Sequence, residues 1–252
     1  MTPRFSCALN GVSPESIDPA LRVTDVTELP PRRRVATVPT IRHGLRLLSR
    51  VRESLTVRIS FVIPEYDPAR RRALLQKLHA WADPGGVLTT SDRPGQQLQV
   101  MCDTLPMLSA LAWSDVVQID LTACEIPFWQ QAEETCVLTG SEAVLTLPGD
   151  ADETPVSCDV TNTGASTVTA VTLACGSTQM TFTGIALAPG SVLTVDASAA
   201  PLRCTIDGSS VLMHRTGESA DLLLADSGAA TPVSVSADGN VQAVFHARGR
   251  LL

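Results

Sequence analysis

Two clusters of arginine are the residues in this chain whose type and spacing best suit binding chemistry. The first lies in Pro30–Arg34, after two prolines, and the second is Arg70–Arg72, within a segment of helical periodicity. Guanidinium groups bind nucleic-acid phosphates and protein carboxylates through paired N–H donors. Three consecutive helical residues point in different directions, so at most two of the second cluster share a face. Both clusters are candidates for contact with an anionic partner, either a nucleic acid or an acidic protein surface.

Histidine and cysteine show no pattern typical of a metal centre. A zinc site needs ligands at short spacings such as H-x-x-x-H or C-x-x-C, and neither spacing occurs. The histidines are far apart, at His43, His79, His214 and His246. The seven cysteines are scattered, at Cys7, Cys102, Cys124, Cys136, Cys158, Cys175 and Cys204. We expect no metal and no cofactor, and we expect most cysteines to be small buried hydrophobic residues in strands.

No catalytic constellation is apparent. The G-x-S-x-G elbow, the P-loop and G-x-G-x-x-G are absent. Ser91–Gly95 contains residue types found in active sites, but Ser and Asp cap turns and Pro-Gly favours one, so this segment predicts a tight turn. A glycosidase needs two paired carboxylates, and no spacing selects a pair from Glu142, Asp150, Asp152, Glu153 and Asp159. We predict no catalytic residue and therefore a protein that is not an enzyme.

Charge and composition divide the chain into two parts. Residues 1–132 carry 15 Lys and Arg against 13 Asp and Glu, whereas residues 133–252 carry 4 against 13. The second part is also rich in Ser, Thr, Ala, Gly and Val, a composition typical of short strands and tight turns. We place a domain boundary in the polar stretch near residue 130, which gives domains 1–130 and 131–252. No apolar run is long enough for a membrane span or a secretory signal, so we expect synthesis in a cytoplasm without membrane insertion.

The first domain shows strands around a single helix. Residues 55–63 alternate between apolar and polar side chains, as do residues 117–123 and, more weakly, residues 98–102. Asp67 and Pro68 have the residue types of a helix N-cap and first turn, and Leu74, Leu78 and Trp81 then form an apolar stripe. These elements predict a small barrel or rolled sheet with one helix packed across it.

The second domain shows only strand patterns. Alternating apolar residues recur about every 10 to 14 residues, separated by turns that contain Gly, Pro, Asn or Asp. The apolar positions are Val156/Cys158/Val160, Val171/Leu173, Met180/Phe182, Leu193/Val195, Val233/Val235 and Val241/Ala243/Phe245. This regularity, uninterrupted by a helical pattern, predicts a β-sandwich.

Several short stretches of the first domain resemble the distal tail proteins of Firmicutes siphophages and prophages, in the same order. They cover residues 8 to about 128 and are Ile17–Pro19, Leu21–Asp25, Gly44–Leu48, Arg52–Leu55, Glu65–Arg71, Trp81–Ala82, Leu88–Gln96 and Cys102–Pro106. The resemblance implies a mainly β fold, with an N-terminal split β-barrel carrying one packed α-helix and a C-terminal galectin-like β-sandwich.

The resemblance also implies a function and a set of partners. Members form a hexameric ring at the virion tail tip, assembled in the bacterial cytoplasm. This baseplate hub joins the tail tube to the tail-associated hub protein (tail lysin or spike), and the tape-measure protein is a further partner. DNA passes through its lumen without specific binding, and in some phages the outer domains hold a receptor-binding protein. No catalytic residues are known for the family. In such a ring the arginines favour a subunit interface over DNA contact, with candidate residues Arg32, Arg33, Arg34, Arg70 and Arg71.

A carbohydrate-binding sandwich for host attachment is the alternative function. Sugar sites commonly stack the pyranose ring on an exposed aromatic side chain. After Trp129 the chain has no Trp or Tyr, and its two phenylalanines, Phe182 and Phe245, lie in apolar strand patterns. The sequence therefore favours an acidic spacer or docking platform over a sugar-binding domain.

Overall fold

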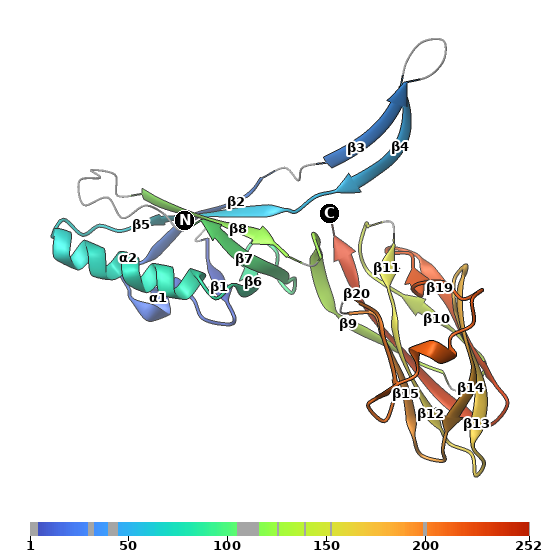
Figure 1. The fold of residues 1–252 in the computed structure, drawn as a ribbon. Coiled ribbons are helices and arrows are strands. Elements are labelled where there is room, and N and C mark those ends of the chain that lie inside the picture. The colour runs from blue at the N-terminus through green and yellow to red at the C-terminus, as the bar shows by residue number, and fades with distance from the viewer. Residues whose placement is uncertain are drawn as a thin grey trace. The chain divides into compact units, whose positions relative to one another are not determined.

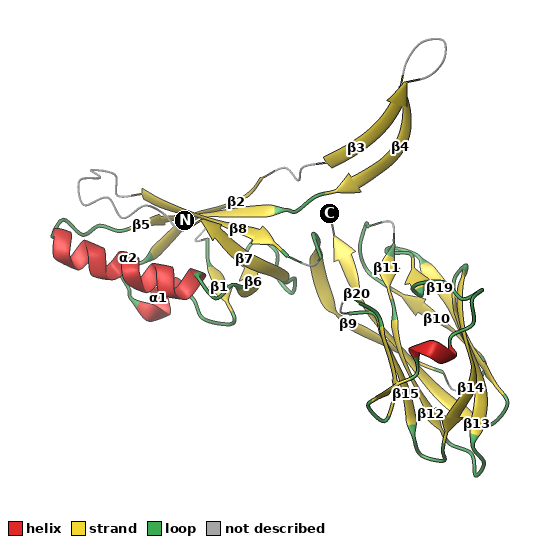
Figure 2. Cartoon of the chain, viewed as in Figure 1, coloured by secondary structure: helices red, strands yellow, loops and turns green. Residues whose placement is uncertain are grey.

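The chain folds into two compact units in a computed structural model, Met1–Trp129 and Gln130–Leu252. Figures 1 and 2 show both units as assemblies of antiparallel strands, with helices on unit 1 and a short 3₁₀ helix on unit 2. The structure describes residues 5–29, 33–39, 45–104, 116–124, 126–138, 140–151, 153–198 and 201–251. No helix in these ranges is long and apolar enough to span a membrane.

Unit 1 is built on a six-stranded sheet in which every pairing is antiparallel. In spatial order its strands are β1 (Cys7–Leu9), β6 (Gly86–Thr90), β7 (Leu98–Thr104), β8 (Val116–Ala123), β5 (Thr56–Val62) and β2 (Arg22–Leu29). The expected strands at 55–63, 98–102 and 117–123 are confirmed as β5, β7 and β8. Their apolar positions are buried, as at Val57, Ile59 and Phe61.

One face of this sheet is covered by α2 (Pro68–Ala82), which begins where the sequence predicts it. The Asp67 side chain accepts a hydrogen bond from the amide of Ala69, and Pro68 occupies the first turn. Leu74, Leu78 and Trp81 are buried as expected. The Trp81 ring meets Phe61 edge to face at 6.1 Å, a geometry that aromatic pairs prefer. A second, four-residue helix, α1 (Pro14–Ile17), was not expected; it is capped by Ser13.

The sheet of unit 1 does not close into a barrel among the described residues. Its edge strands β1 and β2 pair only with β6 and β5, respectively. Beyond the β2–β5 ladder, which ends at Leu29 opposite Thr56, the same two segments pair again as β3 (Arg33–Pro39) and β4 (Leu45–Arg52). This hairpin leaves the sheet as a two-stranded arm (Figure 1).

Unit 2 is a β-sandwich, because two sheets share one core. The first contains β10 (Glu142–Thr146), β19 (Ala230–Ala237), β13 (Val168–Cys175) and β14 (Thr178–Leu187). The second contains β17 (Ser209–Ser210), β16 (Arg203–Ile206), β15 (Val192–Asp196), β12 (Ser157–Asn162), β20 (Val241–Leu251) and β9 (Trp129–Val137). Buried residues of both sheets form one cluster, to which Phe182 and Phe245 contribute the largest side chains.

Two short elements complete unit 2, a pair formed by β11 (Thr154–Pro155) with β18 (Leu224–Ala225), and the 3₁₀ helix η1 (Leu212–His214). Asn162 fixes one end of the sandwich although it is 1% exposed. Its Nδ2 donates to the carbonyls of Ser166 and Leu187, each at 2.8 Å, and its Oδ1 accepts from the amide of Gly164 at 2.9 Å. A buried amide that is hydrogen-bonded in this way specifies the turn without an unpaired polar group.

Candidate assembly surfaces

The hairpin β3–β4 pairs with no other strand among the described residues. From Arg34 to Val38 every residue is exposed, so neither face of β3 packs against a core. Val35 and Val38 are 52% and 42% exposed. A two-stranded hairpin is marginally stable alone in water, since it buries little apolar surface. The described side chains of β3 are therefore available for contact with another molecule.

The charge of this arm is opposite to that of the chain. Residues 32–52 contain seven arginines and no Asp or Glu, whereas the whole chain has a net charge of −7. Of the predicted interface residues, Arg32 lies outside the described residues, Arg33 is the first residue of β3, and Arg34 is exposed on that strand. The candidate residues Arg33 and Arg34 therefore lie on a hairpin, which their charge alone did not indicate.

The arginines of α2 are separated by the fold. Arg70 is exposed, and its Nε lies 3.8 Å from Asp67 Oδ2 at the helix start. Arg71 is buried, and its Nη1 donates to the carbonyls of Ile63 and Glu65 at 3.3 and 3.5 Å. Arg71 therefore holds the segment that precedes the helix. Because its side chain is buried, it exposes little surface to a neighbouring subunit.

A charged cluster that sequence reasoning missed surrounds Arg93, in the predicted turn at Ser91–Gly95. The turn itself is present: the amide of Gln96 bonds to the carbonyl of Arg93, and Gly95 has φ +76°. The Arg93 guanidinium forms a two-point ion pair with Glu28 of β2, and its centre lies 5.3 Å from the ring centroid of Trp129. Arg93 thus ties the last residue of unit 1 to the sheet, through charge and a cation–π contact.

A second missed pair lies on the sheet face opposite the buried positions of β5. Arg58 Nε and Nη2 donate to the two carboxylate oxygens of Asp120 on β8, at 2.7 and 2.8 Å. The hydrogen bond from Arg58 holds the pKa of Asp120 below its ordinary value. Alternation places both side chains on the polar face, but only the cross-strand register, Arg58 opposite Asp120, brings them together. The pairing leaves this part of the face without net charge.

The residues with catalytic or metal-binding potential are not brought together. Among the described residues, no three His, Cys, Asp or Glu side chains form a group that could hold a metal. His43 and Asp152 lie outside the described residues, and His79 and His214 lie on α2 and η1. His246 lies on β20, with Nε2 3.3 Å from Asp159 Oδ2.

The other carboxylates considered for a glycosidase pair lie apart in the topology. Glu142 is on β10, in the four-stranded sheet. Asp150 and Glu153 lie in the segment before β11, and β11 belongs to a separate two-stranded sheet.

Six of the seven cysteines lie in strands, and four are buried: Cys7, Cys158, Cys175 and Cys204. Burial raises the pKa of all four thiols, and it raises those of Cys7 and Cys175 to about 12. The buried cysteines therefore stay protonated at neutral pH and act as small apolar residues, as predicted.

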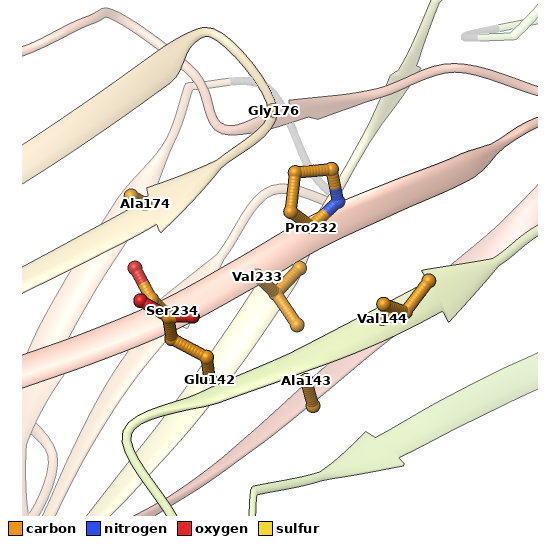
Figure 3. Close-up of a pocket in the computed structure, with 8 residues that line it drawn as sticks. All are labelled: Glu142, Ala143, Val144, Ala174, Gly176, Pro232, Val233 and Ser234. Carbon is orange, nitrogen blue, oxygen red and sulfur yellow. The ribbon is translucent and has the colours of Figure 1, made fainter.

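The outer face of the four-stranded sheet in unit 2 has a shallow hollow of about 390 Å³. Its lining includes Val144, Pro232 and Ala174, with Glu142 and Ser234 close together at one end (Figure 3). No aromatic side chain lines it. Phe182 and Phe245, the phenylalanines of unit 2, are both fully buried in the sandwich core. Unit 2 thus lacks the exposed aromatic platform on which sugars commonly stack.

The fold of the whole chain is shared with a solved phage protein. The crystal structure of SPP1 Dit (gp 19.1), described as a paradigm of the hub adsorption apparatus in Gram-positive infecting phages, superposes with a TM-score of 0.72 at 11% identity. The match covers 98% of this chain and 99% of that one, so it includes both units. No model of a known protein family matches the chain, and no curated protein matches it in sequence.

Two weaker likenesses are to chains of phage P2 baseplate structures in the activated conformation. The form with Ca has a TM-score of 0.49 at 8% identity and covers 99% of this chain and 98% of that one. The form with Sr has a TM-score of 0.44 at 7% identity and covers 97% of each chain. Both scores are too low to establish a shared fold.

Proposed function

We propose that this protein is a structural component of a phage tail tip, where six copies form a ring that serves as the baseplate hub. The observation that carries the proposal is the fold shared with SPP1 Dit across both units. The ring would connect the tail tube to the tail-associated hub protein and leave a channel for DNA. On this proposal the protein belongs to the virion, and it acts by assembly and not by catalysis.

The hairpin β3–β4 supports the ring. Copies related by rotation meet through two different surfaces, and repetition of that contact closes a ring. An arm whose strand β3 is exposed from Arg34 to Val38, and whose sequence carries no acidic residue, suits one of these surfaces. Clustered guanidiniums then pair with carboxylates of the neighbouring copy, and they also steer the encounter. The galectin-like character of unit 2 belongs to the same proposal and follows from the resemblance of unit 1 to the family.

The polar face of the unit 1 sheet is consistent with a channel that lets DNA pass. Arg58 is paired with Asp120, so this part of the face offers DNA no free cation. Unpaired arginines or lysines would hold phosphates by counterion release and slow the passage of a genome.

Native mass spectrometry tests the proposal. A ring of six 26.6 kDa chains has a mass of about 160 kDa, and we expect this species to dominate at micromolar protein concentration. A monomer at every concentration, which also fails to bind tail-tube and hub proteins encoded beside it, would refute the proposal. Adjacent genes for a tape-measure protein and a large hub protein would support it.

A further inference from the structure

The sheet edges of unit 2 differ in how they are covered. The edge of β14 is covered by the segment after η1, because the amide of Thr216 donates to the carbonyl of Thr181. The amide of Ala220 donates to the carbonyl of Gln179 in the same way. The edge strand β9 carries the exposed acidic residues Glu133 and Glu134. Strand β10 pairs with β19 on one side, and no described strand pairs with its other side. Proteins normally protect such an edge, since its free backbone groups can pair with another chain.

Hydrogen bonds show which backbone groups of β10 face away from β19. The amide of Val235 on β19 donates to the carbonyl of Ser141, so Ser141 faces β19, and alternate residues after it do the same. The intervening residues Glu142, Val144 and Thr146 therefore face outward. Val144 lies opposite Pro232, whose carbonyl accepts from Gly176 of the next strand turn, in agreement with this register. The Val144 carbonyl itself accepts a hydrogen bond at 3.6 Å from the thiol of Cys136 on β9, a weak donor that the N–H of an added strand can replace.

Side chains beside this edge form a receptor surface of defined chemistry. Val144 is 59% exposed and lies at the hollow described above, together with Pro232 and Ala174. Glu142 is exposed at one end of the hollow, and no described residue forms an ion pair with it (Figure 3). An apolar trough that ends in a carboxylate matches the methylene stem and charged head of lysine or arginine.

We propose that β10 binds an extended segment of a partner protein as an additional strand, with a lysine or arginine of that segment over the hollow and its cation at Glu142. Backbone groups of Glu142, Val144 and Thr146 supply the pairing, and Glu142 selects a basic residue. The charge of unit 2 favours such a partner, because Gln130–Leu252 holds 13 Asp and Glu against 4 Arg. This site is independent of ring formation by unit 1.

The test uses the full-length chain and a displayed library of random nine-residue peptides, with counter-selection against Val144→Pro. Proline at 144 removes the outward N–H and leaves the β10–β19 hydrogen bonds in place. We expect enriched sequences that contain Lys or Arg, and a labelled synthetic copy that binds the wild-type chain. Val144→Pro should weaken this binding at least ten-fold, while the matched Val144→Thr, which keeps the N–H, should bind about as well as the wild type.

Two charge variants separate the edge from the side-chain contribution and do not depend on the proline variant folding. Glu142→Gln should weaken the peptide about two- to five-fold at low salt, with the difference lost at high salt, as for an exposed ion pair. Glu142→Lys should weaken it further. Absence of enrichment, or enriched peptides without basic residues, would overturn the proposal. Binding by both Glu142 variants as tight as binding by the wild-type chain would overturn it too. Self-association of the wild-type chain that Val144→Pro abolishes would assign the edge to a second copy and would overturn it as well.

Discussion

Replacing the two exposed valines of the hairpin by serine is expected to dissociate the proposed ring into smaller species. Val35 and Val38 are 52% and 42% exposed, so about half of each side chain is available for burial against a neighbouring copy. Full burial of a valine stabilises by about 1.5 to 3 kcal/mol, which gives about 2 kcal/mol for the two half-exposed side chains together. Each subunit contact in the double variant Val35→Ser, Val38→Ser would then be about 30-fold weaker.

Mass photometry over a dilution series measures this effect. A closed ring of six copies contains six such contacts, and the equilibrium constant for its assembly contains the product of all six contact constants. The concentration at which rings appear should therefore rise at least as much as one contact weakens, about 30-fold. Val137→Ser is the matched control, because Val137 has a similar exposed fraction, 48%, but lies on β9, outside the hairpin. Equal unfolding midpoints for the three proteins would show that the folds are intact. Rings of the double variant at the wild-type concentration would refute the assignment of the hairpin to the subunit contact.

Three further predictions concern the units themselves. Asn162→Asp should destabilise unit 2 by about 3 to 5 kcal/mol in urea unfolding, because the carbonyls of Ser166 and Leu187 lose their donor and meet a buried carboxylate; a loss below about 1 kcal/mol would be incompatible with the structure. Arg58 lowers the pKa of Asp120, so the ion pair stabilises the folded chain fully at pH values above the ordinary pKa of this carboxyl. The stabilisation by the pair is lost as the pH falls through the lowered pKa of Asp120. Asp120→Asn should therefore lower the unfolding midpoint at neutral pH but not at about pH 2, and an equal effect at both would contradict the pairing. The thiols of Cys7 and Cys175, with pKa values raised to about 12, should react with a disulfide reagent only on unfolding, and rapid labelling of the native chain would show that they are not buried.

Periodicity predicted the well-buried elements of this fold. Strand β5 has apolar residues at every second position, and the helix from Pro68 has both a cap and a stripe, so local pattern and tertiary burial agree. In unit 2 each predicted alternation became a strand, from β12 to β20. The barrel, in contrast, was inferred from strands around one helix, and closure depends on pairing between edge strands, which alternation does not encode.

The surfaces were harder to predict because they depend on register and exposure. Arg32–Arg34 were predicted as interface residues because three arginines are consecutive. The hairpin is defined by the pairing of Arg33–Pro39 with Leu45–Arg52, which this run of charge does not indicate. Arg71 has the same residue type as Arg70, yet it is buried against backbone carbonyls. The ion pair of Arg93 with Glu28 joins residues 65 positions apart, and no sequence spacing indicates it. Charge composition locates a basic segment, and only the fold shows which charges remain available.

Electron cryomicroscopy of the purified full-length chain tests the central claim most directly. The account predicts class averages with six-fold symmetry, an open centre lined by unit 1, and added tail-tube protein bound to one face of the annulus. Particles that never exceed the size of a single chain, at concentrations where the chain is folded, would contradict it.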